Sequence, residues 1–343
     1  MEQTITIDAL EAKVTAIFRR AGMNDVQSGA LARVLTAGER DACKSHGIYR
    51  IEGALRTLKA GKVAGDAVPR LLPDDGGALV RVDAQGGFSN AAFELGLPVL
   101  VERARALGLA ALVVNDGTHF TALWPEVEAL TERGLAALVM CPSYATVAPA
   151  GGTTPLLGTN PFAFGWPRPD GAPYVFDFAT SVAARGEIEL HRRAGTPLPE
   201  GWAIGADGQP TTDPDAALAG AMLPFGGHKG SAIATMIELL AGVMIGDRTS
   251  PDVLAHLGST ALAPQHGELI LALAPERFAA GRAGDPVARA EALFAAIEAQ
   301  GARLPSQRRF AARAQHRAQG ITLSASEAGQ LDRFQKHGLD MIA

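Results

Sequence analysis

The sequence predicts an α/β fold, in which a mixed sheet of the α+β type is combined with helical N- and C-terminal parts. Three observations lead to this prediction. The first third of the 343 residues repeats apolar side chains at helical spacing. The middle alternates short apolar runs with glycine-rich turns and with longer helical patterns. No G-x-G-x-x-G fingerprint follows a strand, so a Rossmann fold is not expected.

The composition excludes several classes of protein. Hydrophobic residues make up 47% and charged residues 20%, which is enough apolar surface for a core and argues against disorder. The net charge of −5 offers no basic surface to nucleic acid or to an anionic membrane. No apolar run reaches the length of a membrane span, and the first residues do not resemble a signal peptide. Cys43 and Cys141 stand far apart in sequence, so we expect free thiols, a cytoplasmic location and no metal site.

Three helices are expected in the N-terminal third. The first begins after a cap at Asp8 and ends at Gly22. The second and third cover residues 26–35 and 51–58. A short polar junction, residues 41–50, separates them, and we expect any helix that begins there to place side chains four residues apart on one face.

The middle of the chain carries the strands. We expect strands in residues 78–83, 109–114, 135–141, 174–181 and 267–275. A helix over residues 91–107 separates the first two. Another follows the glycine-rich turn at the start of residues 226–246. Residues 149–161 read as loop and residues 195–216 as an irregular surface excursion.

A helix over residues 286–300 and a basic, arginine-rich tail close the chain. We therefore expect two domains. Residues 1–72 together with 286–343 form a helical domain, and residues 73–285 form a central sheet domain.

Four short segments hold candidate functional side chains. Ser45 and His46 stand in the polar junction, and Arg50 follows four residues after the histidine. Histidine titrates near neutral pH, and the planar fork of arginine suits a carboxylate. His119 directly follows an expected buried strand, which is where α/β proteins place ligands. Each of these side chains also has a purely structural interpretation, as a helix cap or a satisfied loop histidine.

The other two segments are loops. Thr159 lies in the run Gly-Thr-Asn-Pro, which is otherwise ordinary turn chemistry. His228 and Lys229 stand among three glycines before a hydrophobic helix, an arrangement that favours a bound phosphate. Asp177 and Glu187 are candidate partners for a histidine, or else solvated carboxylates.

Seven motifs occur in the order seen in one known family: SHGIYR, VDAQGG, THF, GTNPFAF, VFDFATS, GWAIGADGQPTTDP and PFGGHKG. The chain thus resembles the malate/L-lactate dehydrogenase-like (type 2) oxidoreductases over essentially its whole length. This resemblance implies a non-Rossmann NAD(P)-binding fold, a homodimer and a small-molecule substrate. It places the catalytic Ser-His pair in the helical domain and the NADP-binding part in the central one.

Within the family, the run HFTALWPEVE with LPFGGHKGSA resembles the Δ1-piperideine-2-carboxylate/Δ1-pyrroline-2-carboxylate reductases. The resemblance implies NADPH-dependent reduction of cyclic imino acids to L-pipecolate and L-proline, by hydride transfer to C2. The alternative is an NAD(P)-dependent 2-hydroxy acid dehydrogenase of the malate, lactate or ureidoglycolate type, because the same arginine and histidine would serve a carbonyl substrate.

The resemblance also implies roles for individual residues. Ser45 and His46 match the catalytic pair, and Glu187 aligns with an aspartate that completes a charge relay. Arg50 and Thr159 match substrate-binding positions. The stretches that match cofactor-binding positions contain His119, Phe120, Thr121, Ala122, Leu123, Asp177, Phe178, Ala179, His228, Lys229, Arg303, Pro305, Ser306, Gln307, Arg308 and Arg309.

Three positions depart from the family pattern. Glu187 is one methylene longer than the usual aspartate. Pro142 stands where the reductases more often have asparagine, and the tail reads PSQRR where PGERR is more usual. A flat, apolar side chain at Trp124 would suit a ring-shaped substrate, although a large apolar residue at a helix start is also an ordinary core residue.

Overall fold

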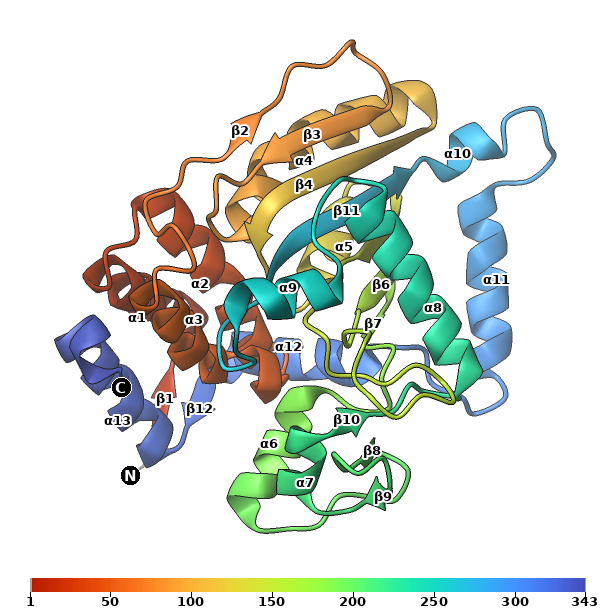
Figure 1. Ribbon diagram of the computed structural model, residues 1–343. Coiled ribbons are helices and arrows are strands. Elements are labelled where there is room, and N and C mark those ends of the chain that lie inside the picture. Colours follow the sequence, from red (N-terminus) through yellow and green to blue (C-terminus); the bar gives the residue numbers. More distant parts are fainter. Residues whose placement is uncertain (1, 343) are drawn as a thin grey trace.

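A seven-stranded sheet lies at the centre of the computed structural model, which describes residues 2–342 (Figure 1). The strands run in the spatial order β2-β3-β4-β11-β5-β6-β7. β3 and β4 are parallel, and the other neighbours are antiparallel. The bounds are β2 Arg70–Leu71, β3 Leu79–Asp83, β4 Leu109–Thr118, β5 Ala136–Met140, β6 Phe162–Trp166, β7 Tyr174–Phe178 and β11 Gln265–Leu273. The predicted mixed α/β architecture is confirmed.

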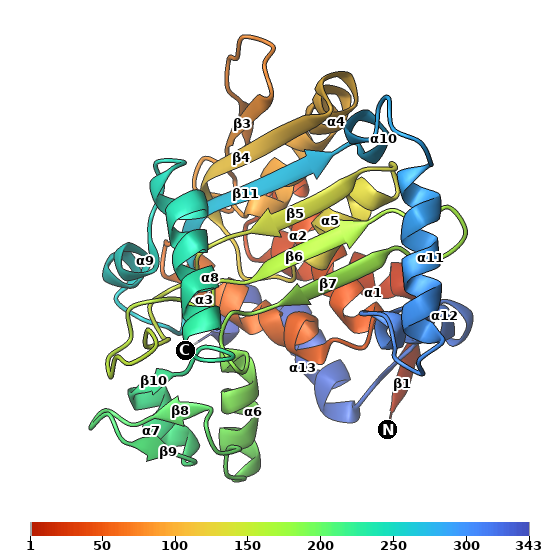
Figure 2. The same cartoon turned by 90° about the vertical axis from the view of Figure 1, so that its right-hand side faces the viewer.

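Both faces of the sheet are covered, which explains why its central strands are apolar without alternation. On one face, α4 (Ser89–Leu107) and α5 (Trp124–Thr131) bury their apolar sides against β3, β4 and β5. On the other face lies α8 (His228–Glu238), which continues as a π-helical turn, Leu239–Val243 (Figure 2). Because helices pack against both faces, the sheet is held in place, and so are the ends of the strands, which carry the site residues.

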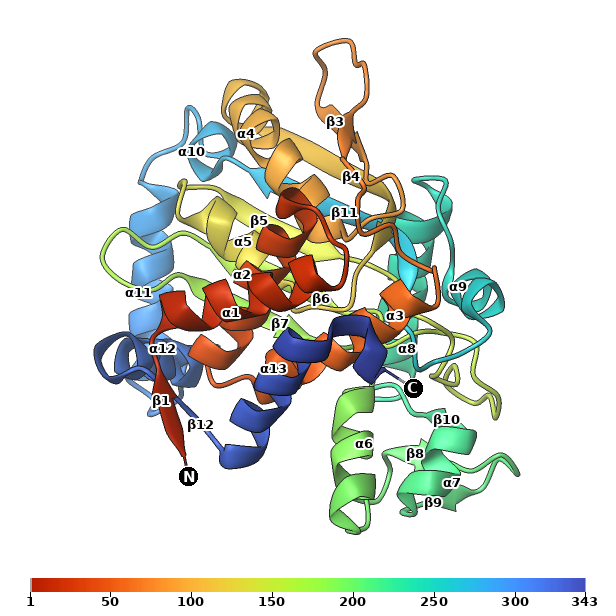
Figure 3. The ribbon, with the colours of Figure 1, turned by 90° about the vertical axis from the view of Figure 1, so that its left-hand side faces the viewer.

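A second layer of helices packs beyond α4 and contains the N- and C-terminal parts (Figure 3). The N-terminal cap is Thr6, whose hydroxyl accepts a hydrogen bond from Ala9 N, and not Asp8 as the sequence predicted. Short strands at the two ends of the chain, β1 and β12, pair antiparallel. The bounds are β1 Gln3–Ile5, α1 Ile7–Arg20, α2 Asp25–Arg40, α3 Ile51–Lys59, β12 Ile321–Leu323, α13 Ala325–His337 and a 3₁₀ turn η4 Gly338–Met341.

A small lobe projects from one end of the sheet, at the bottom of Figure 1. It has an apolar core of its own, and the predicted irregular excursion contributes short strands and a helix to it. Its elements are α6 Arg185–Ala194, β8 Ala203–Ile204, β9 Pro210–Thr211, α7 Pro214–Ala219 and β10 Ala221–Met222.

The structure also contains a strand that the sequence did not predict. β6 follows the predicted loop of residues 149–161, and it forms because Phe162 to Trp166 pair with both β5 and β7. The C-terminal part is helical, as predicted: α12 (Gln307–Gln319) and α13 occupy the basic tail, and α13 begins with a capping box between Ser324 and Glu327. The remaining elements are α9 Ser250–Leu257, α10 Pro275–Phe278 and α11 Pro286–Glu298.

The predicted domain boundary at residue 286 stays a prediction, but α11 contacts the sheet. Phe294 stacks on Tyr174 of β7, with ring centroids 5.1 Å apart, and Glu291 forms an ion pair with Arg168 beyond β6. Within residues 2–342, no helix is long and apolar enough to cross a membrane.

Candidate active site

A cavity of about 1020 Å³ opens between the helical layer, the sheet and the small lobe. It is lined by segments far apart in the sequence: the junction after α2, the loop after β4, the end of β7, the start of α6 and residues 260–264. Of the predicted site residues, the cavity is lined by Ser45, His46, Arg50, His119, Phe120, Thr121, Ala122, Thr159, Asp177, Phe178, Ala179, Glu187 and Arg308.

The junction after α2 forms two 3₁₀ turns, η1 Lys44–His46 and η2 Ile48–Arg50, and not the start of a helix. The Ser45 hydroxyl lies 3.0 Å from His46 Nδ1. The Arg50 Nε donates a hydrogen bond to the Ser45 carbonyl at 2.7 Å. The two consecutive 3₁₀ turns therefore direct the side chains of Ser45, His46 and Arg50 toward the same cavity.

Glu39, at the end of α2, holds this junction in place. Its Oε1 accepts a hydrogen bond from Ile48 N at 3.0 Å, and its Oε2 lies 2.6 Å from Lys44 Nζ. A Cβ on Gly47 would lie 2.1 Å from Glu39 Oε1, so only glycine fits there. Sequence reasoning missed Glu39; an acidic residue on the inner face of a predicted helix was the available signal.

Arg50 is half-buried and forms no ion pair with an acidic side chain in residues 2–342. Its guanidinium lies 5.9 Å from the ring centroid of Phe120 and 6.0 Å from that of Tyr49. A guanidinium that lies against aromatic rings and is not paired with a carboxylate can bind an anionic ligand through its two terminal nitrogens.

Burial, together with the nearby positive charge of Arg50 and the nearby His119, lowers the pKa of His46 to about 3. The sequence suggested a side chain with the ordinary histidine pKa. Its imidazole is neutral at neutral pH, because desolvation disfavours the charged form. With Nδ1 accepting from the Ser45 hydroxyl, Nε2 would carry the proton and act as a hydrogen-bond donor.

Trp124 belongs both to the cavity wall and to the core. Its side chain is 5% exposed, and its ring meets that of His46 edge-on, with centroids 6.3 Å apart. The Arg309 guanidinium lies 4.8 Å from the Trp124 centroid on another side. The buried Trp124 Nε1 has no partner within the described residues.

Asp177 caps α5 and does not touch a histidine. Its Oδ2 accepts hydrogen bonds from Leu123 N at 2.8 Å and Trp124 N at 3.0 Å. Burial raises the pKa of this carboxyl above its usual value. Leu123 itself is fully buried in the core and is absent from the cavity lining, and its predicted contact with a cofactor stays a prediction.

Asn160 fixes the loop that presents Thr159. Its Oδ1 accepts hydrogen bonds from Ser143 N and the Ser250 hydroxyl, each at 3.1 Å. Its Nδ2 donates to Glu238 Oε1 at 2.7 Å. The Thr159 side chain is left half-buried at the cavity.

The predicted relay through Glu187 is not present. The Glu187 side chain is exposed, and its Oε2 accepts from Ala184 N at 3.3 Å at the start of α6. No hydrogen bond joins it to His46 in the described residues. The extra methylene lets the carboxylate fold back on its own helix. Its neighbour Arg185 lines the cavity instead and donates to the Thr260 hydroxyl at 3.0 Å.

His228 and Lys229 are exposed at the start of α8, after Gly226 and Gly227 with positive φ, and lie outside the cavity lining. In the tail, Arg308 is exposed at the cavity. The other predicted tail residues, Arg303, Pro305, Ser306, Gln307 and Arg309, are absent from the lining.

Arg309 is buried in an ion-pair network, which corrects its predicted contact with a cofactor. Its Nη1 lies 2.9 Å from Asp41 Oδ2 and 2.5 Å from Glu128 Oε1, and Arg313 binds the same two carboxylates. Burial raises the pKa of Asp41, but hydrogen bonds from Arg313 and Arg40 outweigh that effect and lower the pKa to about 2. The network, which sequence reasoning missed, ties α2, α5 and α12 together beside the site.

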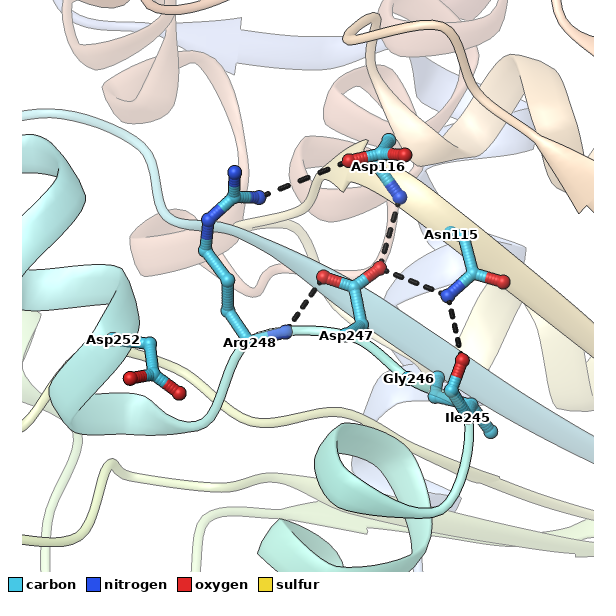
Figure 4. Close-up of a pocket in the computed structure, with 7 residues that line it drawn as sticks. All are labelled: Asn115, Asp116, Ile245, Gly246, Asp247, Arg248 and Asp252. Atoms are coloured by element: carbon cyan, nitrogen blue, oxygen red, sulfur yellow. Dashed lines mark hydrogen bonds and ion pairs between the residues drawn. The ribbon is translucent and has the colours of Figure 1, made fainter.

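A second, smaller hollow of about 400 Å³ lies where β4 and β11 meet the turn after α8 (Figure 4). Asp247 Oδ2 accepts from Asn115 Nδ2 at 3.1 Å and from Asp116 N at 2.9 Å. Arg248 N donates to Asp247 Oδ1 at 2.8 Å. These hydrogen bonds join the turn to the sheet, and the groups that line the hollow are partners of one another.

A cavity that contains Arg50 beside the Ser45–His46 pair can bind a small anionic substrate. Comparison with known proteins shows the family to which the chain belongs. Residues 5–332 match the family described as malate/L-lactate dehydrogenase, and the chain belongs to this family. The resemblance seen in the motifs is thereby confirmed.

The most informative relatives are reductases. The chain is 74% identical over 340 residues to a Δ1-pyrroline-2-carboxylate reductase of Agrobacterium fabrum, covering 99% of each chain. It is 57% identical over 319 residues to a Δ1-pyrroline-2-carboxylate/Δ1-piperideine-2-carboxylate reductase of Pseudomonas aeruginosa, covering 93% of this chain and 95% of that one. The crystal structure of a Δ1-piperideine-2-carboxylate reductase from Pseudomonas syringae pvar. tomato superposes with a TM-score of 0.92 at 39% identity, covering 97% and 99%.

The buried network gives the first prediction. Replacing Asp41 by asparagine leaves Arg309 and Arg313 with one carboxylate between them, so the free energy of unfolding at neutral pH should fall by about 3–5 kcal/mol. Since the folded-state pKa of Asp41 is depressed, this stabilisation is present above the ordinary aspartate pKa and is lost as the pH falls through about 2. Urea unfolding of Asp41→Asn and wild type at neutral pH measures the difference. Equal stabilities would show that the network contributes nothing.

Proposed function

We propose that this protein is an NADPH-dependent reductase of cyclic imino acids, which converts Δ1-pyrroline-2-carboxylate to L-proline and Δ1-piperideine-2-carboxylate to L-pipecolate. The observation that carries the proposal is the half-buried Arg50 without an acidic partner, beside the Ser45–His46 pair in one cavity. The relatives named above, which match nearly the full chain, support the choice of substrate.

The residues present fit a nicotinamide cofactor. Trp124 places a flat ring and an unpartnered indole N–H at the cavity wall, and Thr159 and Ala179 also line it. Arg308 adds an exposed positive charge at the cavity, which favours a phosphorylated cofactor. On this basis we propose NADPH as the preferred cofactor. The bound cofactor would supply a hydride; the protein supplies orientation and charge.

Each side chain of the site then has a defined task. The Arg50 fork would hold the substrate carboxylate and fix C2 for attack. His46, neutral and held by Ser45, would donate its Nε2–H to the imine nitrogen and hold that atom in place. Trp124 and Phe120 form apolar walls that exclude water and suit a five- or six-membered ring. Thr159 would bind the remaining polar edge of the substrate.

A panel of substrates tests the proposal. With NADPH, kcat/KM for the two cyclic imines should exceed that for pyruvate and oxaloacetate by about tenfold or more, because the Glu187 carboxylate at the cavity favours a cationic iminium over a neutral carbonyl. NADPH oxidation is followed by absorbance, and the panel is repeated with NADH, which should be the poorer donor. Faster reduction of oxaloacetate would favour the 2-hydroxy acid dehydrogenase of the malate type.

The role of Arg50 gives a separate prediction. Arg50→Lys keeps the charge but loses the two-pronged geometry, so KM for the imine should rise about tenfold to hundredfold with a smaller effect on KM for NADPH. Arg56→Lys is the matched control, since Arg56 also lines the cavity but is already paired with Glu52. An unchanged substrate KM in Arg50→Lys would mean that another cation holds the carboxylate.

We also propose that the protein acts as a cytoplasmic homodimer. Four large apolar side chains at helical spacing are exposed along α8, its π-helical extension and the residue that follows it: Met236, Leu239, Val243 and Met244. An exposed apolar stripe of this kind favours a protein interface. Two copies of this chain would bury it by a symmetric contact. The free thiols of Cys43 and Cys141 are compatible with a reducing compartment.

The dimer proposal is tested by molar mass in solution. Leu239→Glu should turn a dimer into a monomer in analytical ultracentrifugation, because it buries a charge at the interface. Leu107→Glu is the matched control: Leu107 is 53% exposed and Leu239 is 54% exposed, but Leu107 lies at the end of α4. A monomeric wild type, or a dimer that both substitutions leave intact, would contradict this use of α8.

A further inference from the structure

A fully buried acidic side chain, Glu39, packs against the turn that carries Ser45 and His46. Its carboxylate contacts the turn on both sides of the pair. Oε2 forms an ion pair with Lys44, the first residue of η1, and Oε1 accepts a hydrogen bond from the amide of Ile48, the first residue of η2. Lys44 directly precedes the serine, and Ile48 follows the histidine by two residues. The pair therefore lies between two contacts with one carboxylate.

The backbone of the turn lies so close to α2 that no extra side-chain atom fits between them. A Cβ on Gly38 of α2 would lie 2.4 Å from the carbonyl oxygen of His46. A Cβ on Gly47 would lie 2.1 Å from Glu39 Oε1. Ala42, which precedes the turn, has a φ of 56°, in the left-handed region that residues other than glycine rarely adopt. Such a backbone persists only where its surroundings hold it, and Glu39 supplies two of the contacts that do so.

One exposed lysine balances the charge of Glu39. Within residues 2–342, Lys44 is the cation that forms an ion pair with this carboxylate, and the lysine side chain is 51% exposed. Lys44 Nζ also lies 3.1 Å from Oε1 of Glu327, in the first turn of α13. Burial raises the pKa of Glu39, with a contribution from Glu327, whereas Lys44 and the Ile48 amide oppose these effects. The lysine thus connects the buried carboxylate with the C-terminal part of the chain.

The position of the turn determines how His46 and Arg50 face the cavity. The His46 ring meets that of Trp124 edge-on, and Arg50 Nε donates to the Ser45 carbonyl. A shift of the turn would therefore move the histidine and the arginine together, away from the substrate nitrogen and carboxylate. A misplacement of about 1 Å can cost about a hundredfold in rate. The loop after β4 and the end of β7 do not belong to the turn, so cofactor binding should change less.

We propose that Glu39 is the positioning residue of the Ser45–His46 pair. Through Lys44, the same carboxylate links the pair to Glu327 of α13. This inference rests on the proposed imine reductase activity, in which the pair serves the substrate nitrogen. It adds a residue that does not line the cavity and that acts through the turn.

Turnover kinetics test the proposal. Glu39→Ala removes both contacts, so kcat for Δ1-pyrroline-2-carboxylate should fall about tenfold to hundredfold, with little change in KM for NADPH. Glu39→Gln keeps an oxygen that can accept from the Ile48 amide and loses only the ion pair, so most of the activity should remain.

The matched control for these variants is Gln27→Ala. Gln27 is also fully buried on α2 and accepts a hydrogen bond from the Phe88 amide at 2.8 Å, but it lies near the other end of the helix. This substitution should lower Tm and leave kcat unchanged. A wild-type kcat in Glu39→Ala, or an equal loss of kcat in Gln27→Ala, would overturn the proposal.

The close fit between Glu39 and Gly47 gives a second test. Gly47→Ala alone should push the turn away from the carboxylate and lower kcat about as much as Glu39→Ala does. In the double variant, the missing carboxylate leaves room for the added methyl group, so the two losses should not multiply. Losses that do multiply would show that the two residues act independently and would overturn the proposal.

The link to α13 is tested at Lys44 and Glu327. Lys44→Met leaves the buried carboxylate without its cation, so kcat should lie between the values of wild type and Glu39→Ala. Glu327→Gln keeps a side chain that can form the capping box of α13 and should have a smaller effect than Lys44→Met. A wild-type kcat in Lys44→Met would overturn the link to α13.

A measurement without substrate separates this proposal from the proposed function. Nitrogen-15 NMR follows the His46 ring, whose burial depends on the position of the turn. In Glu39→Ala the ring should become more exposed and titrate at a higher pH than in wild type, whereas Gln27→Ala should match wild type. This comparison decides the role of Glu39 even if the protein reduces neither cyclic imine. Identical His46 titrations in Glu39→Ala and wild type would overturn the proposal.

Discussion

The site depends first on the Asp41 carboxylate and the two arginines that bind it. Asp41 directly follows α2 and is the first residue of the junction that carries Ser45 and His46. Arg309 and Arg313 belong to α12, and through Glu128 they also hold α5, which begins at Trp124. Arg309 packs on the Trp124 ring as well. Helices from both ends of the chain and from its middle are thus fixed to one another by a few buried ionic contacts.

Burial then determines how the charges inside the cavity behave. Arg50 stays charged and needs an anion, whereas His46 beside it becomes a neutral hydrogen-bond donor. Burial likewise raises the pKa of the Glu126 and Glu268 carboxyl groups, which lie close to His119. A cavity that sets the Arg50 guanidinium beside a neutral histidine suits a carboxylate-bearing imine, since the guanidinium can bind the carboxylate and the imidazole can donate a hydrogen bond to the nitrogen.

The fold class and the position of the cavity could be predicted from local patterns. The strand before His119 was predicted to end at Val114, yet its pairing with β11 carries it on to Thr118, and the histidine directly follows it. The helices near the N-terminus could be predicted because each has a clear apolar period and a stop signal. β6 could not, because only its pairing with β5 and β7 identifies it as a strand, and the helical C-terminal part was predicted without the bounds of α12 and α13.

The same distinction separates the site residues. Ser45, His46 and Arg50 are neighbours in sequence, so a short motif reveals them. Glu268 is buried on a strand 149 positions after His119, and no local pattern joins the two. Arg309 stood in a basic run typical of a phosphate site, but its partners Asp41 and Glu128 bury it. Charge in a sequence does not show which face of the fold it will occupy.

The protonation state of His46 is the central claim, and it can be measured directly. Nitrogen-15 NMR of the histidine rings, with His46→Asn to assign the signal, follows the imidazole over about pH 5 to pH 8. We expect His46 to stay neutral over this range, as its pKa of about 3 requires. We expect its pKa to rise when NADP⁺ and L-proline bind, because the carboxylate on Arg50 offsets the guanidinium charge. A titration of the free protein centred near the ordinary histidine value would contradict the neutral state of His46 on which this account rests.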